Sequence, residues 1–246
     1  MTWKIKSINF SLKPWLLGLC LLAQVNFISA QTEEIEVVNS DRPDMTDGVQ
    51  TVSKGRFQIE NGLTFAKQTV ENNWMLRVGI SKSTEVRLGV DAGLEDGLKG
   101  LKPLTLSFKQ RLLEEQGFFP ALTLIGGLSY GEIASKEFQE NKLDYELILS
   151  FENTLTDKLS LGYNIGISNN FKDLNFTIGL GYDFSDKIAT YLEYYSVFSG
   201  EDPNYNVDFG LLYHIKPKLQ IDMAMGTSMF EKDKHLFGTI GVSYLF

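Results

Sequence analysis

The chain has 246 residues, of which 43% are hydrophobic, and its formal net charge at pH 7 is −8. This length and composition suit one domain of either a soluble or a membrane-embedded protein. The acidic balance, without a basic stripe along the chain, argues against nucleic acid as a partner.

The first 30 residues have the pattern of a secretory signal peptide. Lys4, Lys6 and Lys13 precede an apolar run of about 11 residues, and a small-residue ending follows at Ala30. The run is too short for a membrane-spanning helix, which needs ~20 residues. Cleavage after Ala30 removes the single cysteine, Cys20, and takes the charge from −8 to about −11. The mature chain then has neither a disulfide nor a thiolate metal site.

The residues that follow divide into two parts. Residues 31–54 are rich in acids, Ser and Thr and have weak periodicity, so we expect an irregular N-terminal segment. Residues 55–246 alternate apolar and polar side chains, which is the pattern of strands with one apolar and one polar face. The pattern predicts twelve strands, at 56–66, 73–80, 84–94, 104–113, 121–130, 143–153, 159–168, 174–184, 188–197, 205–215, 219–228 and 237–246.

Two features favour a membrane barrel over a β-sandwich, which also alternates. Short turns follow every second strand, and the longer connections lie near 95–103, 131–142, 198–204 and 229–236, as expected for periplasmic turns and outer loops. Aromatic residues gather near both ends of the strands, as in interfacial girdles. The sequence therefore predicts an all-β fold, a transmembrane antiparallel up-and-down β-barrel of about twelve strands rather than ten or fourteen.

The end of the chain supports the same location. The last predicted strand places Tyr244 and Phe246 on one face and ends on Phe246. This resembles the C-terminal signal by which the barrel assembly machinery recognises outer-membrane barrels. We expect a monomer surrounded by outer-membrane lipids.

The inward positions of the predicted strands carry charge of both signs. Facing arcs of opposite charge would set a field across the lumen and orient a polar solute. Alternatively the charges pair with one another to fill a narrow interior, because eight strands leave a filled barrel whereas 16 to 18 leave a channel. Glu60 and Arg77 lie inward on adjacent strands. The candidate lumen residues are Glu60, Arg77, Glu85, Arg87, Lys109 and Arg111, and the acids Asp144, Glu146, Glu193, Asp208 and Asp222.

The residue types of the chain give little support for catalysis or metal binding. Only His214 and His235 could serve as the imidazole of a Ser-His pair, and neither has a neighbouring serine in a recognisable motif. Two histidines without a cysteine make a transition-metal site improbable. Glu201, Asp202 and Asn204 are oxygen ligands suited to Ca²⁺, but such loops usually are only solvated. We predict no enzyme activity, no cofactor and no metal.

Residues 41–65 resemble the opening of a known family. The matching residues are Asp41-Arg42-Pro43, then Lys54-Gly55, then Gln58 to Gly62, with Asn61 where a small or hydroxyl residue is expected. The family consists of outer-membrane "transporter" proteins named for the meta-pathway of phenol degradation. The resemblance implies an outer-membrane barrel that takes up small, aromatic or hydrophobic compounds.

These observations predict a passive porin-like channel for a small molecule that the sequence does not identify. The first alternative is a non-transporting structural or surface-binding barrel with a closed lumen, and the second is a barrel hydrolase. Because Asp41, Arg42 and Asp44 precede the first strand, we expect this segment to fold into the lumen as a plug. Arg42 would then pair with an inward acid such as Glu60.

Overall fold

The computed structural model describes residues 36–139, 141–200, 203–231 and 235–246. The predicted signal peptide, with Cys20, and residues 31–35 lie outside these ranges. Within the described ranges, no helix is long and apolar enough to cross a membrane.

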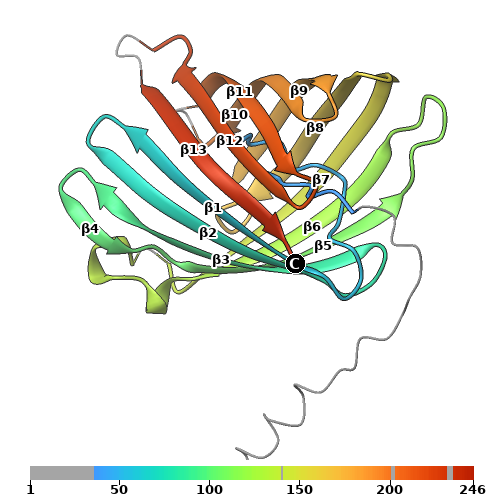
Figure 1. The fold of residues 1–246 in the computed structure, drawn as a ribbon. Coiled ribbons are helices and arrows are strands. Elements are labelled where there is room, and N and C mark those ends of the chain that lie inside the picture. The colour runs from blue at the N-terminus through green and yellow to red at the C-terminus, as the bar shows by residue number, and fades with distance from the viewer. Residues whose placement is uncertain (1–35, 140, 201–202, 232–234) are drawn as a thin grey trace, which may run out of the picture. The chain divides into compact units, whose positions relative to one another are not determined.

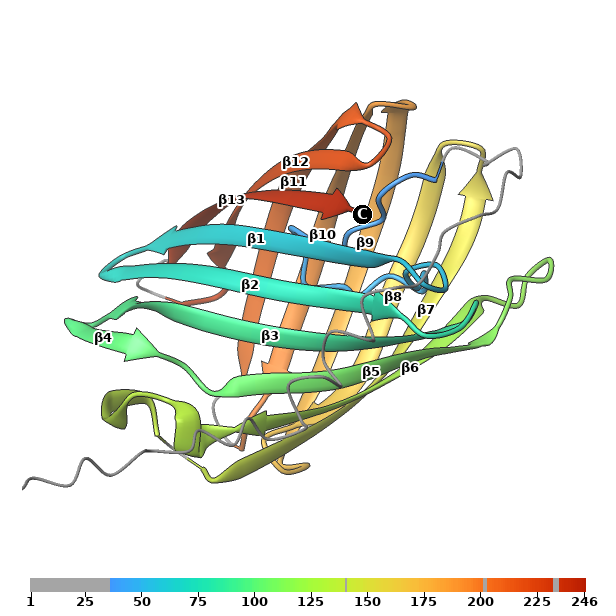
Figure 2. The same ribbon diagram turned by 60° about the horizontal axis from the view of Figure 1, so that its bottom comes forward.

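The strands form one closed antiparallel sheet, in which all but one pair of consecutive strands are hydrogen-bonded neighbours (Figure 1 and Figure 2). The ring closes where the first strand pairs with the last along nearly its full length. The strands are β1 (Phe57–Ala66), β2 (Thr69–Gly79), β3 (Thr84–Glu95), β4 (Leu98–Leu101), β5 (Leu104–Leu113), β6 (Ala121–Tyr130), β7 (Leu143–Thr156), β8 (Leu159–Ser168), β9 (Asp173–Ser185), β10 (Ile188–Phe198), β11 (Asn204–Lys216), β12 (Leu219–Ser228) and β13 (Leu236–Leu245).

The barrel has twelve strands, as predicted, because β4 and β5 together make one interrupted strand. Both pair with β3. The last four residues of β3 pair with β4, and the first six residues of β3 pair with β5. Lys102 and Pro103 separate them, and proline cannot donate a hydrogen bond to a neighbouring strand. The predicted fold class, an all-β antiparallel barrel, is confirmed.

The predicted loop over residues 95–103 is wrong. Strand β3 continues to Glu95, and the chain turns at Asp96 and Gly97, which have φ angles of 50° and 86°. Asp-Gly is a strong signal for a two-residue hairpin turn, because both positions need positive φ. Strand β2 likewise begins at Thr69 rather than at residue 73, so only Lys67 and Gln68 connect it to β1.

We call the end where β1 begins and β13 finishes the proximal rim, and the opposite end the distal rim. Two of the distal connections are two-residue turns. The prediction of short turns at one rim and long loops at the other therefore holds only in part. The connection between β6 and β7 is long, as predicted, and contains two short 3-10 helices, η1 (Gly131–Ile133) and η2 (Lys136–Phe138).

The two faces of the wall differ in polarity as the alternation predicts. Large apolar side chains on the outer face are exposed, among them Trp74 at 49% and Leu192 at 60%. Inside, Arg77, Glu85 and Lys109 are each at most 1% exposed. The buried side chains are therefore mainly polar and charged groups that face the lumen, whereas in a soluble domain the buried side chains are mainly apolar.

Aromatic pairs lie at both rims of the barrel. At the proximal rim the rings of Phe57 and Phe246 stack with centroids 4.4 Å apart, and Tyr244 contacts Phe246 at 4.6 Å. At the distal rim Phe198 and Tyr205 pack edge to face at 6.0 Å. Phe246 thus joins the end of the chain to the start of β1, and its backbone N–H donates to the carbonyl of Phe57 at 2.9 Å.

Candidate functional site

Residues 36–54, which we call the lumen segment, enter the barrel from the proximal rim (Figure 2), and residues 39–48 line its interior. They form bends and turns but neither helix nor strand. Their hydrogen bonds reach strands on different sides of the wall, with Ser40 to Ser243 of β13 at 2.8 Å, Thr46 to Thr177 of β9 at 2.7 Å, and Thr123 of β6 to the carbonyl of Val49 at 2.8 Å. The lumen segment is therefore fixed to the wall across the width of the barrel.

Asp41 is the centre of a buried ionic cluster on one side of the lumen. Its carboxylate lies 3.0 Å from the Nζ atom of Lys109 and 3.2 Å from Arg77, and it accepts a hydrogen bond from Arg87. Glu85 bridges the two arginines, at 2.9 Å from Arg77 and 2.6 Å from Arg87. We call Asp41, Arg77, Arg87 and Lys109 the Asp41 cluster.

The charges of this cluster keep Asp41 ionised. Burial opposes ionisation, but the positive charges of Arg77, Lys109 and Arg87 outweigh it and hold the pKa of Asp41 well below its usual range. The three cations come from β2, β3 and β5, which are neighbours in the wall. The basic arc predicted from the sequence is thus present, and an aspartate of the lumen segment neutralises part of it.

Arg42 pairs with an inward acid, as expected, but with Asp222 rather than Glu60. Its guanidinium lies 3.2 Å from Asp222 and donates to the hydroxyl of Thr239 at 3.0 Å. The predicted partner, Glu60, instead pairs with Arg77 at 2.8 Å. Alternation places Glu60 on the inner face but does not determine which cation lies at the same height in the lumen.

A pair of glycines makes room for Arg42. Gly62 of β1 lies opposite Gly241 of β13 at the closure of the barrel. A Cβ atom would lie 1.9 Å from Nη1 of Arg42 at position 62, and 2.5 Å from its Nε at position 241. The guanidinium therefore packs directly on the backbone of these two strands.

The opposite side of the lumen is acidic. Glu193 of β10 accepts the backbone N–H of Met45 at 2.8 Å and the hydroxyl of Thr46. Asp208 of β11 lies opposite Glu193 in the strand register, and neither of its carboxylate oxygens has a hydrogen-bond donor among the described residues. Burial and the charges of Glu193, Asp41 and Asp208 raise the pKa of Asp44 well above its usual value. We call Asp44, Glu193 and Asp208 the acidic cluster.

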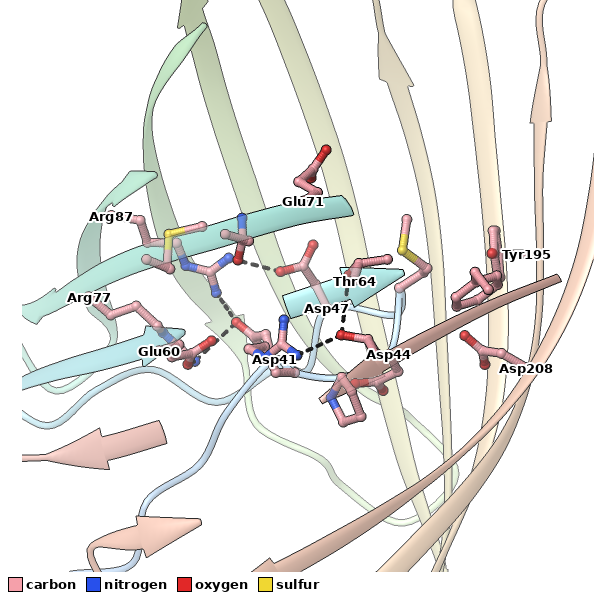
Figure 3. A pocket seen from close by; sticks show the side chains of 17 residues that line it. Asp41, Asp44, Asp47, Glu60, Thr64, Glu71, Arg77, Arg87, Tyr195 and Asp208 are labelled. Carbon is pink, nitrogen blue, oxygen red and sulfur yellow. Dashed lines mark hydrogen bonds and ion pairs between the residues drawn. The ribbon is translucent and has the colours of Figure 1, made fainter. Parts of the chain in front are cut away.

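The lumen segment divides the interior into two cavities. The distal cavity measures about 500 Å³, and its lining includes Arg77 and Arg87 on one side and Tyr195 and Asp208 on the other (Figure 3). The proximal cavity measures about 190 Å³ and includes Thr46 and Tyr191. Asp44 lines both cavities, so it marks the boundary between them.

Several predicted lumen residues lie away from this boundary. Arg111 bonds Gln50 at 2.9 Å and pairs with Glu114 at the proximal rim. Asp144 bonds Asn141 and Asn170 at the distal rim. The side chain of Glu146 covers Gly127 on the inner face.

The remaining candidates have the following surroundings. His214 lies 3.3 Å from the carbonyl oxygen of Val38, and His235 lies 3.4 Å from Glu231. Among the described residues no group of three or more His, Cys, Asp or Glu side chains is suited to hold a metal ion. Of the loop considered for Ca²⁺, Glu201 and Asp202 lie outside the described residues.

Sequence reasoning missed the residues through which the lumen segment makes several of its contacts. Asp47 pairs with Arg87 at 2.8 Å, and Thr46 bonds both Thr177 and Glu193. The regular spacing of Asp41, Asp44 and Asp47 was the available signal. In a strand, acids at every third position would fall on opposite faces in turn. In an irregular segment, the same spacing suits a chain that crosses a charged lumen.

The glycine pair gives a first test. Gly241→Ala should displace the Arg42 guanidinium from Asp222 and lower the free energy of unfolding by about 1–3 kcal/mol, the usual cost of overpacking. Unfolding in detergent micelles measures this. Gly238→Ala on the same strand is the control, since the nearest atom to its Cβ is 3.7 Å away. Equal losses in the two variants would contradict the role of the glycine pair.

The ionisation of Asp41 gives a second test. Because its pKa is lowered in the folded state, its contribution to stability is present above the ordinary value of 3.8 and is lost as the pH falls below it. Asp41→Asn should cost about 3–5 kcal/mol, as for a broken buried ion pair. We expect this difference from the unchanged protein to persist from neutral pH down to 3.8 and to shrink at lower pH. Denaturant unfolding at several pH values tests it, and a difference that vanishes well above 3.8 would disprove it.

Comparison with known proteins places the chain in a family. Residues 40–246 match the family described as "Putative MetA-pathway of phenol degradation". Among curated proteins, no sequence matches the chain.

Solved structures of outer-membrane channels share the fold. The COG4313 outer membrane channel from Pseudomonas putida F1 has a TM-score of 0.65 at 10% identity, covering 80% of this chain and 98% of that one. The KdgM porin in complex with disordered oligogalacturonate has a TM-score of 0.60 at 12% identity, covering 76% and 98%. The NanC porin has a TM-score of 0.56 at 10% identity, also covering 76% and 98%.

At these identities the structural likeness establishes the barrel fold alone. The family match is stronger, because it spans most of the chain and includes the lumen segment from residue 40 onward. The resemblance seen in residues 41–65 is thereby confirmed, and the protein belongs to the family described as "Putative MetA-pathway of phenol degradation".

Proposed function

We propose that the protein is a passive outer-membrane channel for small solutes and that the lumen segment forms its constriction. The observation that carries this proposal is the division of the lumen into two cavities that meet at Asp44. The proximal rim faces the periplasm and the distal cavity opens outward, which is the usual orientation for a barrel with short periplasmic turns. A distal cavity of about 500 Å³ lies in the size range of small-molecule sites.

The charges around the distal cavity support small neutral or cationic solutes. Six acidic and three basic residues line it. The KdgM porin was solved with oligogalacturonate, a chain of carboxylate sugars. An acidic lining repels such a polyanion, so we do not extend that ligand to this chain. The family's link to phenol degradation fits a small solute but identifies none of the residues that would recognise it.

A closed, non-transporting barrel is the alternative, and one observation favours it. The lumen segment is held by buried ion pairs and by hydrogen bonds to several strands. If these contacts never open, the barrel has a structural role. The two proposals differ in whether solute passes and in whether loosening the lumen segment changes the flow.

Single-channel recording in planar bilayers tests the constriction. Asp41→Asn removes the anion from the Asp41 cluster at nearly constant size. Breaking a buried ion pair costs about 3–5 kcal/mol, so the variant should release the lumen segment far more often than the unchanged protein. We expect a higher conductance or a higher open fraction.

A reversible cross-link supplies the matched control. The hydroxyl oxygens of Thr46 and Thr177 are 2.7 Å apart, and Cys20 lies in the predicted signal peptide. Replacing both threonines by cysteine should therefore allow one disulfide that fixes the lumen segment to β9. In a protein that carries Asp41→Asn and both cysteines, oxidation should abolish the gain in conductance or open fraction, and a reductant should restore it.

Two results would count against the proposal. If Asp41→Asn conducts like the unchanged protein whether the cross-link is oxidised or reduced, the lumen segment is not the constriction. If none of these proteins conducts or admits small solutes into liposomes, the closed barrel is the better account.

A further inference from the structure

We infer that Asp44 and Asp208 of the acidic cluster, with the ring of Tyr195, form a binding subsite for a small organic ammonium cation in the distal cavity. This inference rests on the proposed channel function, since it names a class of solute for the same lumen. The subsite lies on the wall formed by β10 and β11, with Asp44 contributed by the lumen segment. Figure 3 shows Tyr195 and Asp208 on this side, across the cavity from Arg77 and Arg87.

Among the described residues, no cationic side chain pairs with the carboxyl groups of the subsite. On the opposite wall, Arg77, Arg87 and Lys109 each pair with at least one carboxylate. Arg42, which also lines the distal cavity, pairs with Asp222. Glu193, in contrast, is bonded by a backbone N–H and a hydroxyl, which are both neutral.

Two buried polar side chains near the cluster have no partner among the described residues. Asp208 is 3% exposed, lines the distal cavity, and has no donor for either carboxylate oxygen. Tyr191, which lines the proximal cavity, is 6% exposed, and its hydroxyl is also unpaired. This hydroxyl lies 2.7 Å from the position of a Cβ at Gly210, two residues from Asp208 along β11. A buried carboxylate without a donor or counter-charge is costly, and a bound cation would supply both.

The shape and chemistry of the subsite fit an organic ammonium better than a metal ion. The described residues contain no grouping suited to a metal, and a cavity of about 500 Å³ is far larger than a bare ion. Ammonium N–H groups would donate to the carboxylate of Asp208, which lines the cavity, in charge-assisted hydrogen bonds. The ring of Tyr195 lines the same cavity and offers a cation–π contact to the organic part.

Calorimetric titration of the full-length protein in detergent tests the subsite without requiring transport. The probe is phenethylammonium, and 2-phenylethanol is its neutral counterpart. We expect phenethylammonium to bind and 2-phenylethanol not to bind. Asp208→Asn should weaken binding at least about tenfold, the usual value of a hydrogen bond to a charged group.

Two further variants separate this subsite from other effects. Glu71→Gln removes one negative charge from the same cavity, but Glu71 pairs with Lys102 away from the acidic cluster, so phenethylammonium binding should change little. Tyr195→Leu should weaken binding about fivefold through loss of the cation–π contact. The Tyr195→Leu variant still tests the subsite if the Asp208→Asn variant does not fold.

The outcomes distinguish this inference from the channel proposal. No heat of binding with the unchanged protein, as expected if Asp208 and Glu193 merely share a proton, overturns the subsite. Equal weakening by Asp208→Asn and Glu71→Gln overturns it as well, because binding would then reflect overall charge. In planar bilayers the ammonium probe should reduce the potassium current of the unchanged protein. Binding without any current would retain the subsite and reject the channel.

Discussion

The contact between Asp41 and three buried cations determines much of the interior of this barrel. Arg77, Arg87 and Lys109 extend from neighbouring strands into the lumen, and like charges that are buried repel strongly. Glu60 and Glu85 on the wall offset two of them, and Asp41 contacts all three. The wall therefore needs the lumen segment to balance its charge, and the lumen segment needs the wall to hold an irregular backbone in place.

The same arrangement leaves the two sides of the lumen electrically unequal. The cations on β2, β3 and β5 have carboxylate partners, whereas Asp208 on β11 has no donor among the described residues. A solute at this height would meet paired charges on one side and carboxyl groups without a cationic partner on the other. The selectivity that we propose thus comes from an imbalance of pairing and would not be apparent from a count of inward charges.

The sequence predicted the wall well and its contacts less well. Alternation placed Glu60, Arg77 and Asp208 on the inner face, because side-chain direction in a strand depends only on position along the chain. It did not show that Arg42 would meet Asp222, because that contact depends on how distant strands align around a closed ring. The interrupted strand of β4 and β5 was also missed, although Asp96 and Gly97 carried the signal for its turn. Asp47 and Thr46 lie in an irregular segment, where position along the chain does not determine the direction of a side chain.

The glycine pair at the closure of the barrel has a consequence for the order of assembly. Gly62 and Gly241 come together only when the first strand pairs with the last. The contacts of Arg42 with Asp222 and of Ser40 with Ser243 span 180 and 203 residues of chain. The lumen segment precedes every strand in the chain, yet it bonds residues of the last two strands. The position of the Arg42 guanidinium against both glycines therefore exists only in the closed barrel.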